Sequence, residues 1–112
     1  MKKLLLLLLI SFFTLTSSTP PTELMGNWKI SKIINTKTRK QDNFIDKMSF
    51  KQDGVFEAGK GDLVQSGTWS FDENQNLITL NVGQQDAHYK ILKLSKTKLV
   101  IENFESKIYL KK

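Results

Sequence analysis

The fold is decided by residues 46–71, DKMSFKQDGVFEAGKGDLVQSGTWSF. Met48 and Phe50 alternate with polar residues, and Phe56 resumes the same alternation after a short polar break. Period-two alternation is typical of a strand with one buried face. The break contains Gly54, which supplies the positive φ that a tight turn requires. The stretch therefore predicts an antiparallel hairpin followed by a further strand that carries a tryptophan.

Similar runs continue on both sides of this hairpin, from Leu24 to the C terminus, and no segment of ten or more residues has helical spacing. The residues expected to face inward are Trp28, Ile30 and Ile34; Met48 and Phe50; Phe56 and Ala58; Leu63, Trp69 and Phe71; Ile78, Leu80 and Val82; Tyr89, Ile91, Leu92 and Leu94; Leu99 and Ile101; and Ile108 and Leu110. The shift of phase between Ile91 and Leu92 predicts a β-bulge. The fold class is all-β, with eight antiparallel strands. Closure into a small up-and-down barrel removes both exposed edges, although a two-sheet sandwich fits the same alternation.

The first 18 residues have the features of a secretory signal peptide. Lys2 and Lys3 precede an apolar run, 4–15, which is followed by the small residues Thr16, Ser17 and Ser18. The apolar run is too short for a membrane anchor, which needs about 20 residues. We predict a signal peptide at 1–18, a linker at 19–23 and one domain at 24–112. The exported protein is expected in the periplasm or the extracellular medium, without stable membrane insertion after cleavage.

Composition excludes several classes of protein. The 112-residue chain has room for one small domain, and it has no cysteine for a disulfide, a zinc-thiolate site or a lipid anchor. Removal of the predicted signal peptide leaves 94 residues and lowers the net charge from +6 to +4. The lysines are scattered among acids, and export separates the protein from genomic DNA, so no nucleic-acid partner is expected.

Four motifs in order carry a resemblance to a known family. They are Leu24-x-Gly26-x-Trp28-x-Ile30, Phe50-x-x-Asp53-Gly54-x-Phe56, Gly67-x-Trp69-x-Phe71, and Tyr89-x-Ile91-x-x-Leu94 before Leu99-Val100-Ile101. The chain resembles the bacterial lipocalin-like domain common in envelope proteins of the Bacteroidota, over nearly all of residues 23–112. The resemblance implies a lipocalin-like barrel in which Trp28 packs across the closed end. The chain departs from many relatives because it lacks a lipoprotein cysteine, and it is shorter than a full lipocalin.

Alternating connections place four loops at the end opposite Trp28: 35–43, 59–62, 83–86 and the connection near Glu105. These loops would form the mouth of the barrel. An eight-stranded barrel can be filled by side chains or can hold one small ligand. The residues predicted to line a ligand site are Met48, Phe56, Gln65, Trp69 and Tyr89. Four of them are apolar or aromatic, and the Gln65 amide and the Tyr89 hydroxyl could orient a guest.

Catalysis has little support in the sequence, and we predict a protein that is not an enzyme and has no cofactor. His88 is the only histidine and is expected on the solvent face, while Asp53 is explained by its turn and Glu57 by an outward phase. No metal-ligand spacing, nucleophile elbow or phosphate loop occurs. Two hypotheses remain. One is a carrier or sensor of a small apolar or amphipathic molecule, which the resemblance favours. The other is an envelope interaction module or inhibitor with a packed core, which acts through its loops or a strand edge.

Overall fold

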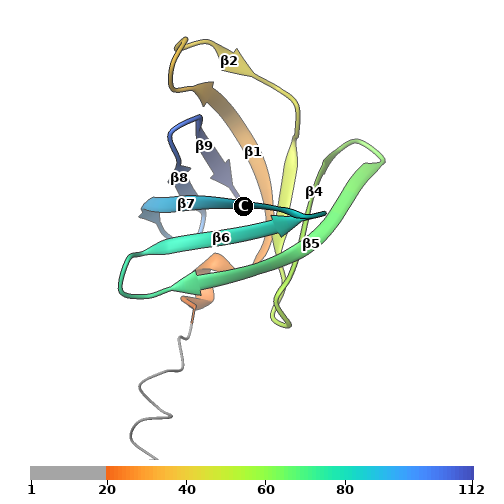
Figure 1. Ribbon diagram of the computed structural model, residues 1–112, viewed down its shortest axis with the longest axis vertical. Helices are drawn as coiled ribbons and strands as arrows, with labels where there is room; N and C mark the ends of the chain where they lie inside the picture. The colour runs from red at the N-terminus through yellow and green to blue at the C-terminus, as the bar shows by residue number, and fades with distance from the viewer. Residues whose placement is uncertain (1–19) are drawn as a thin grey trace, which may run out of the picture.

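The computed structural model describes residues 20–112, and the predicted signal peptide lies outside the described residues. One short 3-10 helix, η1 (Thr22–Leu24), precedes nine strands of a single antiparallel sheet (Figure 1). The strands are β1 (Gly26–Asn35), β2 (Gln41–Asp42), β3 (Lys47–Phe50), β4 (Val55–Lys60), β5 (Leu63–Asp72), β6 (Leu77–Val82), β7 (Gln85–Leu94), β8 (Lys98–Glu102) and β9 (Ser106–Lys111). None of the helical structure in residues 20–112 is long and apolar enough to cross a membrane.

The sheet closes on itself because β1 pairs with β9 as well as with β2 and β3. The short β2 and β3 pair with the same edge of β1, so together they form one interrupted wall. Each later strand pairs with the next one along the chain. The predicted eight-stranded up-and-down barrel is therefore confirmed, and the sandwich alternative is not adopted.

The predicted hairpin is present in β3 and β4, where Met48 pairs with Ala58 and Phe50 with Phe56. The turn adopts the expected geometry, since Gly54 has a φ of 82° and the Val55 amide donates to Asp53 Oδ1 over 3.3 Å. Asp53 therefore stabilises the turn.

Two β-bulges set which residues face inward. In β1 the register shifts between Ile30 and Lys32, so Ile33 is fully buried and the prediction of Ile34 as the inward residue was wrong. The extra residue of a bulge moves every following side chain to the opposite face. The β-bulge predicted in β7 is confirmed by the shift in register after Ile91. The prediction that Leu92 faces inward was wrong, because 45% of its surface is exposed.

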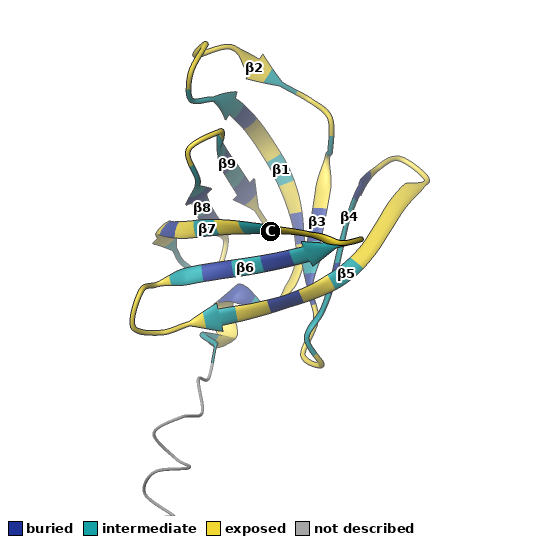
Figure 2. Cartoon of the chain, viewed as in Figure 1, coloured by how far each residue is buried: buried dark blue, intermediate teal, exposed yellow. Residues whose placement is uncertain are grey.

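The core is a single cluster of 14 buried apolar side chains, and residues 20–112 contain no buried polar or charged residue. Buried and exposed positions alternate along most strands, as Figure 2 shows. Burial of apolar area in this cluster supplies the main driving force for folding.

The first half of β5 departs from this pattern. Residues 63–66 are all exposed and pair only with β4, because pairing with β6 begins at Thr68 (Figure 2). Leu63 lies on the predicted face of its strand but is 82% exposed, since the hairpin projects beyond the opposing wall of the barrel. At Gly67 the strand lies so close to β6 that a Cβ atom would come within 1.9 Å of the Asn81 carbonyl oxygen. Only glycine permits this approach.

Candidate functional site

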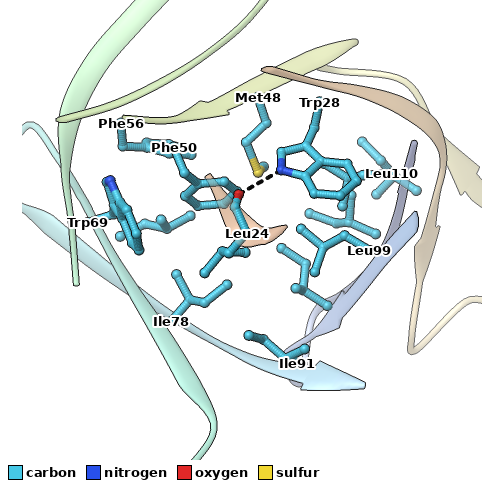
Figure 3. Close-up of a cluster of buried hydrophobic side chains, with 14 residues drawn as sticks. Leu24, Trp28, Met48, Phe50, Phe56, Trp69, Ile78, Ile91, Leu99 and Leu110 are labelled. Atoms are coloured by element: carbon cyan, nitrogen blue, oxygen red, sulfur yellow. Dashed lines mark hydrogen bonds between the residues drawn. The ribbon is translucent and has the colours of Figure 1, made fainter. Parts of the chain in front are cut away.

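One end of the barrel is closed by η1. The Trp28 Nε1 atom donates to the Leu24 carbonyl oxygen over 2.9 Å, and both side chains are buried (Figure 3). On the other side of the indole, the Lys112 Nζ atom lies 4.5 Å from the ring centroid and donates to the carbonyls of Glu23 and Met25. A cation over an aromatic face adds to the stability of this contact. Entry to the interior is therefore blocked at this end.

The loops predicted to form the mouth lie at the opposite end, where the connections 36–40, 61–62, 83–84 and 103–105 meet. Inside them is an open cavity of about 370 Å3. Its lining is mostly apolar and consists of Phe44, Ile45, Met48, Phe56, Ala58, Gln65, Leu80, Val82, Gln85, Asp86, Ala87 and Tyr89. Small-molecule sites are concave, mostly apolar and about 300–1,000 Å3 in volume, so this cavity has the size of a small binding site.

Four of the five predicted site residues meet in this cavity. Met48 and Phe56 form its buried floor, Tyr89 lies half-buried on β7, and Gln65 stands exposed at the rim on the projecting part of β5. Because Gln65 is exposed, its amide can be hydrated when the cavity is empty. The combination is an apolar floor with polar groups near the entrance.

Trp69 does not line the cavity. Its ring packs edge-on against Phe50 with centroids 5.3 Å apart (Figure 3). Its Nε1 atom donates to the Lys51 carbonyl oxygen over 2.8 Å. Phe50 in turn contacts Phe56, at 5.4 Å between centroids. Trp69 therefore belongs to the packed core beneath the cavity, next to Phe50 and its cross-strand partner Leu80.

Sequence reasoning did not identify the wall formed by Phe44 and Ile45. These residues lie between β2 and β3, in the segment that interrupts the strand. The backbone of that segment is held on both sides, since the Ile30 amide donates to the Asp46 carbonyl and the Asp46 amide donates to Gly59. An apolar pair within an otherwise polar connection is the only signal that could have indicated the wall.

The electrostatic character of the cavity depends on a few groups at its entrance. Burial raises the pKa of Tyr89 above 10.0, the nearby Glu105 carboxylate raises it further, and a hydrogen bond with Asn103 partly opposes the shift. Tyr89 is therefore a neutral hydroxyl at physiological pH and can donate a hydrogen bond. Asp86 is the one ionisable carboxylate of the lining, and its Oδ1 atom accepts a hydrogen bond from Asn81.

A larger hollow of about 640 Å3 lies on the outer surface over β1, β3 and β4. The residues around it include Asn27, Lys29, Lys47, Ser49 and Glu57, which point away from the core. Trp28, Ala58 and Val64 also contribute to this hollow, so its lining is largely apolar as well. It lies on the outside of the barrel, whereas the smaller cavity has a floor of buried core side chains, Met48, Phe56 and Leu80. The interior cavity is the better candidate for a small-molecule site.

The groups considered for catalysis stay apart from the cavity. His88 is exposed, with its Nδ1 atom 2.9 Å from Thr79 Oγ1, and Glu57 forms an ion pair with Lys51 at 3.2 Å. Neither residue lines the cavity. Within residues 20–112, no group of three or more histidine, cysteine, aspartate or glutamate side chains is placed to hold a metal ion.

Comparisons with known proteins agree with this geometry. A family model described as a lipocalin-like domain matches residues 24–101. A lipocalin-like protein from Bacteroides uniformis has a similar structure, with a TM-score of 0.67 and 16% identity, over 80% of this chain and 98% of that one. An uncharacterized protein from Bacteroides eggerthii has a TM-score of 0.65 and 11% identity, over 80% and 99% of the two chains. At these identities the structural likeness shows the fold alone. No curated protein matches the sequence.

Proposed function

Because the chain belongs to the lipocalin-like domain family, whose model matches residues 24–101, we propose that it is an exported, non-enzymatic binding protein. The proposed ligand is one small apolar or amphipathic molecule, held at the open end of the barrel. Export is supported by the signal-peptide features of residues 1–18. The apolar cavity lining, which contains no nucleophile paired with a base, supports binding without chemistry.

The observation that carries the proposal is the cavity of about 370 Å3 behind the mouth. Met48, Phe56 and Leu80 provide apolar contact area for a ligand in the cavity. The Gln65 amide and the Tyr89 hydroxyl lie nearer the entrance, where they could bind the polar end of that ligand. This arrangement suits a guest that enters with its apolar part first. The volume suits a ligand of one or two rings or a short acyl chain.

A protein partner at the mouth is a second candidate. Phe44, Leu63, Val64 and Phe104 are large apolar side chains with between 45% and 82% of their surface exposed, and all four lie around or beside the open end. Exposed apolar clusters of this kind occur at sites of protein interaction. The partner in this case would be an envelope protein, as in the interaction module or inhibitor considered from the sequence.

The test blocks the cavity while leaving the fold intact. Ala58 lies between Met48 and Gln65 in the lining, so Ala58→Trp fills the space without removing a core side chain. Ser66→Trp is the matched control, because it adds the same indole to the outer face of the adjacent strand. Both variants and the wild type are titrated with the neutral fluorescent probe N-phenyl-1-naphthylamine. Near-ultraviolet circular dichroism checks that each one is folded.

We expect saturable binding by the wild type and by Ser66→Trp, and loss of binding by folded Ala58→Trp. A ligand with about 17 non-hydrogen atoms and an efficiency near 0.3–0.4 kcal/mol per atom should bind with a Kd of about 10–200 µM. If folded Ala58→Trp binds the probe as tightly as the wild type, the probe is not held inside the barrel. The exposed apolar residues at the mouth would then become the preferred site, and a protein partner the preferred function.

A further inference from the structure

The outer surface of four neighbouring strands carries a row of lysines placed directly opposite one another. In the registers of the sheet, Lys29 of β1 pairs with Lys47 of β3 on one side and with Lys111 of β9 on the other. Lys111 pairs in turn with Lys98 of β8. With neighbouring strands about 4.8 Å apart, the row spans about 14 Å. Like charges directly opposite each other destabilise a sheet, so this row is unfavourable for the free protein.

A second row runs parallel to the first, one step along the strands. In this row Lys32 of β1 lies opposite Tyr109 of β9. Val100 of β8 lies next to Tyr109, and Lys93 of β7 lies next to Val100. The Lys32 Nζ atom lies 4.6 Å from the centroid of the Tyr109 ring. Between the two rows is a hollow of about 340 Å3, bordered by lysines and floored by apolar and aromatic atoms. We call the six lysines of both rows the lysine face: Lys29, Lys32, Lys47, Lys93, Lys98 and Lys111.

Few acidic groups balance these charges. All six lysines of the lysine face are exposed, and the ion pair found within residues 20–112 joins Lys51 to Glu57, outside this face. The outward positions of β7, β8 and β9 carry two acids: Asp86, at the open end of β7, and Glu102, which lies opposite Lys90 and Lys107 in the register of the sheet. The overall charge of the domain is modest, so six exposed lysines gathered on one face make that face locally positive. Figure 1 shows β7, β8, β9 and β1 lying next to one another along that side.

We propose that the lysine face docks the protein on an anionic membrane surface, with the hollow between the rows taking a lipid phosphate. Clusters of four to eight basic residues are typical of attachment to anionic lipids. The charged groups are lysines, which attract phosphate as point charges and do not need the fixed geometry of a guanidinium fork. Tyr109 and the exposed Leu92 lie among or beside the lysines and suit the boundary between headgroups and acyl chains. Predicted export would place a bilayer within reach.

A linear polyanion is a less suitable occupant than a membrane. The hollow is compact, and its lining comes from one short region where β1, β7, β8 and β9 lie side by side. A polymer would need a groove that follows several consecutive charged units, whereas a bilayer presents many phosphates to a convex surface at once. Membrane docking is also independent of the interior cavity, which opens at the end of the barrel.

Co-sedimentation with lipid vesicles tests the proposal. Purified protein is mixed with vesicles of phosphatidylcholine alone or of phosphatidylcholine with one third phosphatidylglycerol. The test variant combines Lys32→Gln, Lys98→Gln and Lys111→Gln. The control variant combines Lys37→Gln, Lys40→Gln and Lys60→Gln, which removes the same charge from the open end. Neutral vesicles reveal any attraction that does not depend on charge.

We expect the wild type and the control variant to bind the anionic vesicles. The test variant should bind them at least about fivefold more weakly, because one lysine near such a surface contributes about that factor to the affinity. Binding should also fall steeply as salt is raised. The test variant should melt no lower than the wild type, since it relieves the pairing of Lys98 with Lys111. If it fails to fold, Lys29→Gln with Lys93→Gln replaces it.

Three results would overturn the proposal. The first is equal binding to neutral and anionic vesicles. The second is an equal loss of binding in the test and control variants, which would show that total charge matters and the lysine face does not. The third is tight binding of a soluble polyanion such as heparin by the lysine face without binding to anionic vesicles, which would indicate a polymer as the occupant.

Discussion

The closed end of the barrel depends on one buried hydrogen bond, which Trp28→Phe would remove. The Trp28 Nε1 atom donates to the Leu24 carbonyl over 2.9 Å, and the indole is 1% exposed. Loss of the donor leaves a buried carbonyl without a partner, at a cost of about 1–3 kcal/mol. Phenylalanine is smaller by roughly 40 Å3, and a residual cavity of that size costs about 1 kcal/mol more. We therefore expect a loss of about 2–4 kcal/mol in the free energy of unfolding.

Urea denaturation measures this loss directly. Trp69 is the only tryptophan left in the variant, so its fluorescence reports unfolding of the barrel. With a slope near 1 kcal/mol per molar urea, the midpoint should fall by about 2 M or more. His88→Ala is the control, because His88 is exposed and its loss should cost less than about 0.5 kcal/mol. A midpoint for Trp28→Phe within error of the His88→Ala midpoint would refute the assignment of η1 as the closure of the barrel.

Three further outcomes follow from particular contacts. Burial raises the pKa of Tyr89, so absorbance titration should show a tyrosine that ionises above the usual range, and Tyr89→Phe should abolish that ionisation. The stability gained from keeping Tyr89 neutral is present below about pH 10 and is lost as pH rises through the higher folded pKa. Gly67→Ala should cost about 3 kcal/mol in thermal melts, because its Cβ meets the Asn81 carbonyl, whereas exposed Ser66→Ala should be nearly neutral. Intact mass of the exported protein should give a chain that begins near Thr19 and carries no acyl group.

Alternation and turn chemistry were enough to predict eight antiparallel strands and two different ends, although alternation alone did not separate a barrel from a two-sheet sandwich. The Gly54 turn fixed the central hairpin, and the meander then placed the mouth loops opposite Trp28. These features are local or follow from the order of the strands. They could therefore be derived from one sequence without knowledge of long-range contacts.

The inward set could not be derived completely, because it depends on where a bulge adds a residue and on how far the opposing wall extends. In β1 the bulge turns Ile33 inward in place of Ile34. The apolar residues Ile30, Ile33 and Ile34 fit both registers, so their pattern does not locate the extra residue. In β5 the alternation correctly assigned the face of Leu63, but no wall lies opposite it. The cavity wall at Phe44 and Ile45 was missed for a similar reason, since that segment is held by backbone bonds from distant strands.

The charges around the two surfaces favour different ligands. Asp86 lines the cavity, and the Glu105 carboxylate lies close enough to Tyr89 to raise its pKa. No lysine or arginine within residues 20–112 lines this cavity. An anionic group inside the cavity would therefore meet the Asp86 carboxylate without a cation in the lining to offset it, whereas a neutral or cationic end would not be repelled. We expect the cavity to prefer uncharged or cationic amphipathic molecules, while the lysine face attracts anions.

Two probes with the same ring system separate these preferences. N-Phenyl-1-naphthylamine is neutral, and 1-anilinonaphthalene-8-sulfonate adds one sulfonate to the same rings. The neutral probe should bind the cavity more tightly, and its binding should be lost in Ala58→Trp and retained in the triple variant at Lys32, Lys98 and Lys111. Any saturable site for the sulfonate should show the reverse dependence, because its charge is attracted to the lysine face and repelled by Asp86 in the cavity lining. The opposite result has two parts: the wild type binds both probes with equal affinity, and Ala58→Trp abolishes the binding of both. In that case the Asp86 and Glu105 carboxylates do not select the ligand by its charge. The cavity would then be selective for shape alone.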